Sequence, residues 1–355
     1  MLVGAAHAHL VLVARLARSP LAGVELHWVT HGEHAVYSGM LPAWVANEAM
    51  RADLTLALRP LASAARAVLH PEGAAGLDAG RRTVQLSGGA VLEADVLSIG
   101  VGSAVRGMEL PGVRDHAAHV KTLAARLERF PAPAGPGVVV GGGMAGVELA
   151  LCLRAVCTDV TLVSETEEVP DGGSAALLRT VRRVLLERGV RLQPGRGVEV
   201  TARDLALSDG RRLPAGLVLW AAGPAPHPLL APSGLALGAQ GGVRVDAELR
   251  SISHPDVFAS GDCADLPRPV PKSGVYSVRE GPALADNVLA RLRGARLHPY
   301  RAQRRALGLL NCGDGTAILS WGRLAGRGRW MRVLKERLDR GFLDRIRRAA
   351  QRTEP

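Results

Sequence analysis

The sequence predicts an α/β fold of two Rossmann-like units, each a three-layer ββα arrangement, with the second unit inserted in the first and a small α+β region after them. A strand, a glycine turn and an Ala/Leu-rich helix follow one another twice, with the turns starting at Gly4 and Gly141. Each unit later has an apolar strand that runs into small residues, ending at Ser103 and Gly223. A chain of 355 residues is long enough for two such units and a tail.

These landmarks also predict the domain boundaries. We expect the first unit to cover residues 1–115 and 225–300, the inserted unit 116–224, and the C-terminal region 301–355. A Pro-rich linker at 131–136 precedes the second glycine turn.

The first unit begins with a strand of only three residues, Met1 to Val3, and a degenerate turn. In the pattern G-x-G-x-x-G, a helix N-terminus holds the pyrophosphate of a dinucleotide. Gly4 occupies the first position, but Ala6 and His9 replace the second and third glycines. Ala6 adds a methyl group where a pyrophosphate must approach. A turn without a ligand therefore stays an alternative, and the first strand is either clipped or begins upstream.

The second turn carries the complete pattern. Gly141 permits the tight turn, Gly143 lets the backbone approach a pyrophosphate, and Gly146 lets helix and strand pack closely. An apolar strand at 138–140 precedes the turn and a helix at 149–156 follows it. We therefore predict a dinucleotide site at this turn.

An acidic residue at the end of the next strand would bind a ribose 2′-OH. That strand, 159–164, is followed by Glu165, so either the acid stands one place late or Ser164 makes the contact. Glu165, Glu167 and Glu168 would repel a 2′-phosphate, which favours NADH over NADPH.

Composition argues against several other classes. Cys152 and Cys157 would lie about 8–9 Å apart on a helix, too far for a disulfide, so packing is the favoured interpretation. His7 and His9 lack the partners that a metal site needs. The cysteine usage, with no signal peptide and no transmembrane segment recognised, favours the cytoplasm. The net charge of +11 is mostly arginine, since three of the 44 basic residues are lysines, and no nucleic-acid motif accompanies it.

The most specific signal is the segment from Ser251 to Ala264, SISHPDVFASGDCA. It resembles the second flavin motif of the two-dinucleotide-binding-domain flavoproteins, the pyridine nucleotide-disulfide oxidoreductase superfamily. The resemblance covers essentially the whole chain. It implies that Asp262, after Gly261, binds the ribityl chain of FAD and that the turn at Gly4 binds its pyrophosphate. It also implies that the second turn binds the nicotinamide nucleotide.

Within this superfamily the chain is most similar to the type II NADH dehydrogenase branch, and there to the flavoprotein module associated with selenide, water dikinase. No dikinase part is present. The similar segments are 37–42 (YSGMLP), 58–61 (LRPL), 271–275 (PKSGV), 278–282 (VREGP) and 330–348.

The resemblance also implies roles for single residues. Glu148 would lie near the nicotinamide, with a packing or hydrogen-bonding role at the domain interface as the alternative. Lys272 would add positive charge beside the reduced flavin. The helix beginning near Gly274 and Val275 would direct its N-terminus at the flavin ring. The further cofactor-binding residues implied are Arg59, Ser103, Glu165 and Gly223.

These motifs predict an FAD-dependent NAD(P)H oxidoreductase that moves a hydride from NADH to FAD and passes electrons to an acceptor. Quinone, a small protein carrier, oxygen and a selenium compound stay open as acceptors, because Val275 and Arg279 stand where type II dehydrogenases carry quinone-site glutamines. The redox-active cysteine pair of the disulfide reductases is absent from the first unit, so disulfide chemistry is not implied. The alternative function is a non-catalytic NADH-binding or sensing protein with an impaired flavin site.

The tail at 323–348 has ten basic and three acidic residues, which is +7 of the total charge of +11. Its apolar residues recur every fourth position and predict one amphipathic basic helix. They are Trp330, Leu334, Leu338, Phe342 and Ile346, with Val333 beside them. Three roles stay open for this helix: peripheral contact with a membrane, packing on the first unit, and a homodimer interface.

Overall fold

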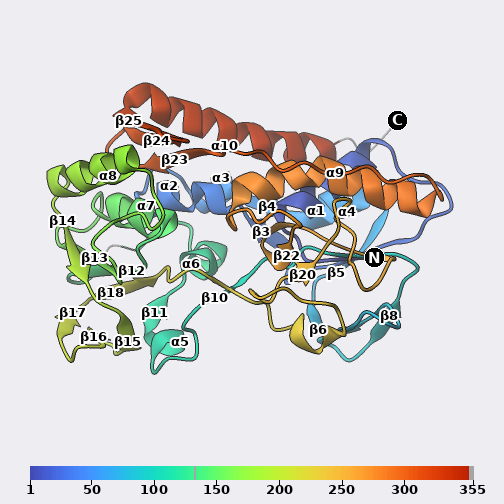
Figure 1. The fold of residues 1–355 in the computed structure, drawn as a ribbon, viewed down its shortest axis with the longest axis horizontal. Coiled ribbons are helices and arrows are strands. Elements are labelled where there is room, and N and C mark those ends of the chain that lie inside the picture. Colours follow the sequence, from blue (N-terminus) through green and yellow to red (C-terminus); the bar gives the residue numbers. More distant parts are fainter. Residues whose placement is uncertain (132, 352–355) are drawn as a thin grey trace.

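The computed structural model describes residues 1–131 and 133–351, which form two α/β units bridged by a C-terminal three-stranded antiparallel sheet and a long helix (Figure 1). The predicted fold class is confirmed, since each unit is built on a parallel sheet covered by helices.

The first unit has a parallel sheet of five strands in the order β21–β9–β1–β2–β5. Because β1 pairs with β2 on one side and β9 on the other, the first glycine turn emerges at the centre of the sheet. The strands are β1 (Leu2–Val3), β2 (Leu26–Val29), β5 (Ala67–His70), β9 (Leu97–Ile99) and β21 (Val257–Ala259).

Helices α1 (His7–Arg18) and α9 (Gly274–Leu292) pack against each other on this sheet. An antiparallel sheet of β6 (Ala74–Asp78), β7 (Thr83–Leu86) and β8 (Val91–Glu93) lies on the other side (Figure 1). The smaller elements of this unit are β3 (His34–Val36), η1 (Ser38–Met40), α2 (Leu41–Val45), α3 (Arg51–Leu54), β4 (Thr55–Ala57), α4 (Leu58–Ala64), β10 (Ala104–Val105), β19 (Pro224–Ala225), η2 (Ala231–Ser233), β20 (Val243–Arg244), η3 (Gly261–Cys263) and β22 (Ala264–Asp265).

The second unit repeats this plan with a parallel sheet in the order β11–β18–β12–β13–β14. Its central strand β12 is rich in valine and fully buried, as suits a strand covered on both faces. Ser174 caps α8 by accepting a hydrogen bond from the N–H of Leu177 at 3.3 Å. The elements are α5 (Val113–His116), β11 (Ala117–Ala118), α6 (Val120–Arg126), β12 (Gly137–Val140), α7 (Met144–Leu153), β13 (Val160–Ser164), α8 (Ala175–Glu187), β14 (Val190–Pro194), β15 (Gly197–Val200), β16 (Asp204–Leu207), β17 (Arg212–Pro214) and β18 (Leu217–Trp220).

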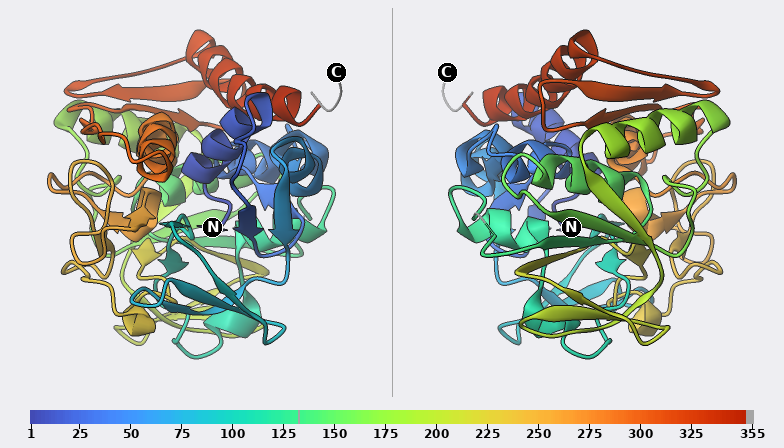
Figure 2. Two further views of the ribbon diagram at one scale, coloured as in Figure 1. Left: turned by 90° about the vertical axis from the view of Figure 1, so that its right-hand side faces the viewer. Right: turned by 90° about the vertical axis from the view of Figure 1, so that its left-hand side faces the viewer.

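The C-terminal region bridges both units. Its elements are β23 (Leu307–Asn311), β24 (Ala317–Trp321), β25 (Leu324–Gly328) and α10 (Arg329–Ala350). Helix α10 packs on α1 and α4 of the first unit, while β25 packs on α8 of the second. Figure 2 shows this three-stranded sheet and α10 as a layer along one side of the molecule.

The tail differs from its prediction in two respects. Residues 324–328 form strand β25, paired with β24, and the helix begins only at Arg329. The apolar stripe also does not face one side: Phe342 and Ile346 are buried, whereas Trp330 and Leu338 are exposed. Spacing of four residues advances about 40° per step on a helix of 3.6 residues per turn, so the stripe rotates by about 160° over its length.

The helix after the second turn also begins earlier than predicted, at Met144, because the last residues of the turn already have helical conformation. Across the described residues, no helix combines the length and the apolar character that crossing a bilayer requires.

Candidate active site

The turn after β12 has the geometry that its glycines predict. Gly141 has φ of +128°, and a Cβ there would lie 2.1 Å from the carbonyl oxygen of Ala221. A Cβ on Gly146 would lie 1.8 Å from the carbonyl oxygen of Gly141, so glycine alone allows α7 to approach this closely. A Cβ on Gly143, the N-cap of α7, would meet nothing within 4 Å. This space lies in front of the first N–H groups of α7. An anion such as a phosphate could bind there, because the first N–H groups of a helix have no partner within the helix.

Strand β13 ends beside the same turn. Ser164 is buried, accepts a hydrogen bond from the N–H of Thr166 at 3.2 Å, and would overlap a Cβ on Gly142. Glu165 is the first exposed residue after the strand. Of the two candidates for the contact with the ribose 2′-OH, Ser164 instead packs against the glycine turn. Glu165 is exposed at the end of the strand, where that contact is predicted.

The first turn keeps the dinucleotide geometry despite its degenerate pattern. Gly4 has φ of +95°, and a Cβ there would lie 2.2 Å from the carbonyl oxygen of Gly100, which follows β9. Ala6, the N-cap of α1, has φ of −68°, which alanine adopts without strain. Because alanine has no polar side chain, Ala6 does not cap the start of α1 through its side chain.

His9 fits at the position of the third glycine because the residue that faces it after β9, Gly100, has no side chain. A Cβ on Gly100 would lie 2.8 Å from the His9 ring, so α1 and β9 still approach closely. The ring is fully buried, and burial lowers its pKa to about 4. His9 therefore lies behind the turn, out of contact with any ligand in front of it.

The Gly261–Asp262 motif lies in η3 at the carboxyl end of β21, in the same sheet as the first turn. Ser103 Oγ donates to Asp262 Oδ2 at 3.5 Å, which joins the strand crossing after β9 to the motif. The N–H of Gly261 donates to Glu280 Oε2 at 2.5 Å. Burial raises the pKa of Glu280. Sequence reasoning missed Glu280 because its partner is a backbone group 19 positions away.

Helix α9 begins at Gly274 without a side-chain cap from Ser273, and Val275 is exposed beside it. A Cβ on Gly274 would lie 3.4 Å from Cε1 of His7 at the start of α1. The N-termini of α1 and α9 therefore lie close together, at one end of the sheet.

Lys272 precedes this helix start and is held by other groups. Its ammonium donates to the carbonyl oxygen of Ala264 and to Asp265 Oδ1, the latter at 2.6 Å. Asp265 offsets its charge, so the role of Lys272 beside a flavin stays a prediction.

Two further predicted residues lie at the edges of the first unit. Arg59 of α4 forms an exposed ion pair with Glu33, and their hydrogen bond lowers the pKa of Glu33. Glu33 follows β2, near where a Rossmann unit places its ribose-binding acid, and was missed. Gly223, with φ of +92°, accepts the N–H of Arg106 where the chain crosses back between the units.

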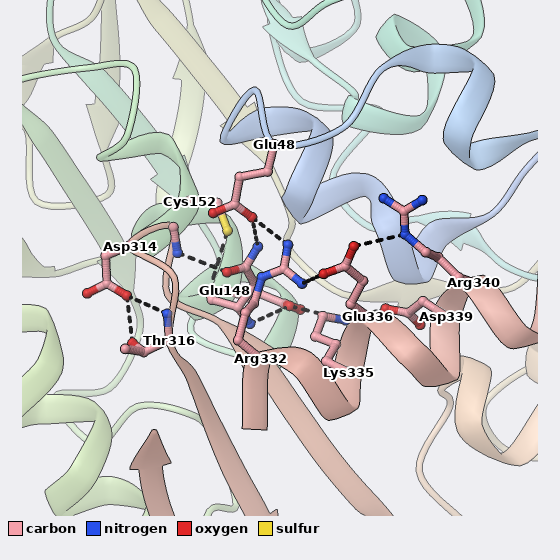
Figure 3. Close-up of polar contacts among 12 residues, drawn as sticks. Glu48, Glu148, Cys152, Asp314, Thr316, Arg332, Lys335, Glu336, Asp339 and Arg340 are labelled. Atoms are coloured by element: carbon pink, nitrogen blue, oxygen red, sulfur yellow. Dashed lines mark hydrogen bonds and ion pairs between the residues drawn. The ribbon is translucent and has the colours of Figure 1, made fainter. Parts of the chain in front are cut away.

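A buried polar cluster joins both units to the C-terminal region (Figure 3). Glu148 of α7 accepts the N–H of Asn311 at 2.7 Å, and its Oε1 lies 3.5 Å from Nζ of Lys335 on α10. Burial raises the pKa of Glu148, although Lys335 opposes this. Burial lowers the pKa of Lys335, but Glu148 and Asp339 outweigh it and the net shift is upward.

The same lysine reaches the first unit. Lys335 Nζ donates to the carbonyl oxygen of Gly39 at 3.0 Å and pairs with Asp339 at 3.1 Å. Asp339 accepts the hydroxyl of Tyr37 at 3.0 Å. One buried ammonium therefore links the second unit, the first unit and α10.

Glu48, at the end of the α2 segment, completes the cluster. It accepts the side-chain amide of Asn311 at 2.7 Å and pairs with Arg332 at 2.8 Å. The alternative role of Glu148, in the interface between units, is the one its contacts show, and a role near a nicotinamide stays a prediction. The sequence holds one sign of this cluster: Lys335, one of only three lysines, has the helical spacing that places it on the same face as the apolar Phe342 and Ile346.

Two Rossmann turns, a Gly-Asp motif at the carboxyl edge of the first sheet and a crossing strand at each boundary define a protein of the two-dinucleotide-binding-domain class. The chain matches the pyridine nucleotide-disulphide oxidoreductase family over residues 1–287 and belongs to it. The superfamily predicted from the sequence is thus confirmed. This family membership implies a flavin and NAD(P)H as ligands.

Similar proteins include an NADH dehydrogenase-like protein of Mycobacterium tuberculosis, 31% identical over 243 residues, or 60% of each chain. The ferredoxin–NAD(+) reductase component of a biphenyl dioxygenase system from Paraburkholderia xenovorans is 33% identical over 54% of this chain and 48% of its own. The chain thus spans about three fifths or less of these relatives.

Solved structures show the same fold. The sulfide:quinone oxidoreductase of Aquifex aeolicus superposes with a TM-score of 0.80 at 17% identity, covering 98% of this chain and 91% of its own. NDH2 of Plasmodium falciparum in complex with NADH gives 0.79 at 12% identity, covering 100% and 98%.

Proposed function

We propose that the protein is an FAD-dependent NADH oxidoreductase that takes a hydride from NADH and passes electrons to a quinone or a small electron carrier. The observation that carries this proposal is the position of Asp262 in the same sheet edge as the first glycine turn, with a second, complete turn in the inserted unit. Similar proteins named NADH dehydrogenase-like and ferredoxin reductase support it.

The flavin supplies the hydride-accepting chemistry when bound. The chain's own residues would bind and orient it: the turn between Gly4 and Ala6 at the start of α1 would lie against a pyrophosphate, and Asp262 would hold the ribityl chain. The start of α9 at Gly274 stabilises negative charge on the ring by its partial positive charge. The Rossmann geometry of the first turn suits the pyrophosphate of a dinucleotide, which favours FAD over FMN.

The geometry of the first turn favours the enzyme over the NADH-sensing alternative. That alternative rested on Ala6 and His9 in place of glycines, and both are accommodated, by an extended N-cap conformation and by Gly100. Glu165, exposed at the end of β13, supports NADH over NADPH.

The surface of the C-terminal region supports contact with the cytoplasmic face of an acidic membrane. Among the described residues, thirteen large apolar side chains are exposed, and five of them fall within 321–338. They are Trp321, Leu324, Trp330, Val333 and Leu338. Four of these residues lie within the stretch of charge +7 at 323–348 and Trp321 lies just before it, and this positive charge matches anionic headgroups.

Vesicle flotation tests this surface. The wild-type chain should float with vesicles that contain anionic lipid and not with neutral ones, and Trp330→Ser combined with Val333→Ser should abolish flotation. Leu186→Ser, at an exposed apolar residue of α8, is the matched control and should float as wild type. A wild-type protein that stays in the bottom fraction of the gradient, and that sediments as a dimer in a separate measurement, would assign the surface to a second copy of the chain.

The flavin test is direct. The purified protein should show a flavin absorbance spectrum that NADH bleaches in the absence of oxygen, and Asp262→Ala should lose the flavin. Asp256→Ala, which removes a carboxylate paired with Arg291 at the start of the same strand, is the control and should retain it. A colourless wild-type protein that takes up no added FAD would contradict the oxidoreductase proposal and support the NADH-sensing alternative.

A further inference from the structure

Resting on the flavin site proposed above, we propose that His9 and Trp28 are positioning residues that set the orientation of the peptide bond between Gly4 and Ala5. They hold it so that its N–H group, and not its carbonyl oxygen, faces the pyrophosphate of the dinucleotide.

The carbonyl oxygen of Gly4 receives two side-chain hydrogen bonds. His9 Nδ1 lies 2.8 Å from it, and Trp28 Nε1 donates to it at 3.0 Å. A carbonyl only accepts, so Nδ1 of His9 carries the proton, and Nε2 accepts the hydroxyl of Ser98 at 2.8 Å. Both ring systems are fully buried, so these two donors lie behind the turn.

Because the peptide bond is planar, the direction of the Gly4 carbonyl also fixes the direction of the Ala5 N–H group. In a trans peptide, the carbonyl and the following N–H point in opposite directions. With the Gly4 carbonyl turned towards His9 and Trp28, the N–H of Ala5 points to the other side. The neighbouring N–H groups are occupied, since Gly4 donates to Val29 at 2.8 Å and Ala6 to Gly100 at 3.1 Å.

The hydrogen bonds from His9 and Trp28 are needed because glycine alone does not fix the orientation of the peptide bond between Gly4 and Ala5. Gly4, with φ of +95°, belongs to the residue type that rotates most easily between conformations. A flipped peptide would present a carbonyl oxygen to an anionic phosphate. His9 brings a donor to this position that a glycine would lack, and Gly100 provides the space for its ring.

A matched pair of variants tests the proposal. His9→Asn keeps an N–H donor at the same distance from the backbone, whereas His9→Leu has nearly the shape of asparagine and no donor. We expect the His9→Leu apoprotein to bind FAD about tenfold more weakly than the His9→Asn apoprotein. The ³¹P resonances of the bound pyrophosphate should move in His9→Leu and stay near their wild-type positions in His9→Asn.

Trp28→Phe is the second variant and should also weaken FAD binding. Its control is Trp44→Phe, because Trp44 is equally buried and donates to the carbonyl of Glu128 at 3.1 Å, outside this turn. Equal FAD affinity of the two His9 variants, or of Trp28→Phe and Trp44→Phe, would overturn the proposal. If His9→Leu does not fold, the tryptophan pair decides. A wild-type apoprotein that takes up no FAD refutes the proposed function instead.

Discussion

At the scale of single residues, the buried imidazole of His9 ties the stability of the first unit to pH. Its pKa is lowered from 6.5 to about 4 because burial disfavours the charged ring. Between these values the unfolded chain binds a proton that the folded protein does not. Stability is therefore complete above pH 6.5 and is lost as the pH falls towards 4, by about 3 kcal/mol in total.

Urea unfolding of the wild type and His9→Asn measures this contribution. The wild type should be the more stable protein at pH 7, and the difference in the free energy of unfolding should shrink at pH 4.5, because asparagine does not titrate. A difference that stays constant between the two pH values would contradict the assignment.

Glu165 sets a second prediction at this scale. If its carboxylate faces the ribose, Glu165→Gln should tighten NADPH binding about tenfold and change NADH binding much less, since the repulsion of a 2′-phosphate is relieved. Fluorescence titration with both nucleotides measures the ratio. Glu93→Gln, at an exposed carboxylate of the first unit, is the control; a ratio that moves equally in both variants would indicate a general charge effect.

At the scale of secondary structure elements, α10 has two faces with different tasks. Its inner face carries Lys335, Phe342 and Ile346 against both units, and its outer face carries Trp330 and Leu338 in solvent. An arginine-rich helix would ordinarily be interpreted as a solvated element, yet one lysine on its inner face is 8% exposed and pairs with two carboxylates. This helix therefore contributes to the interface between the units as well as to the surface.

Lys335→Met should destabilise the protein by about 3 kcal/mol, because it leaves the carboxylates of Glu148 and Asp339 buried without their cation. The loss should decrease at lower pH: burial already raises the pKa of Glu148, and a protonated carboxyl needs no cation. Denaturant unfolding at pH 7 and pH 5 checks both statements. Arg337→Met, on the exposed face of α10, should change stability by less than about 0.5 kcal/mol. An equal loss in both variants would mean that helix propensity, not the buried cluster, is responsible.

At the scale of the whole molecule, the C-terminal region holds the two units in register. The ion pair of Arg332 with Glu48 joins positions 284 residues apart, and Arg327 pairs with Glu187 of α8 and with Asp314. The fold and the second turn could be predicted because Gly141, Gly143 and Gly146 act through local spacing. The cluster around Glu148 could not, because Asn311 and Lys335 approach it only after three distant segments have packed.

The packing of His9 on Gly100 has a consequence for how such a turn can evolve. A histidine at position 9 overlaps any side chain at position 100. A glycine at position 9 can therefore be replaced by histidine only when position 100 is already glycine. The reverse change, a side chain regained at position 100, is blocked for as long as the imidazole remains. The two positions thus constrain the order of their own substitutions. In this chain, the close approach of helix and strand behind the turn depends on the combined volume of positions 9 and 100, not on a glycine at position 9.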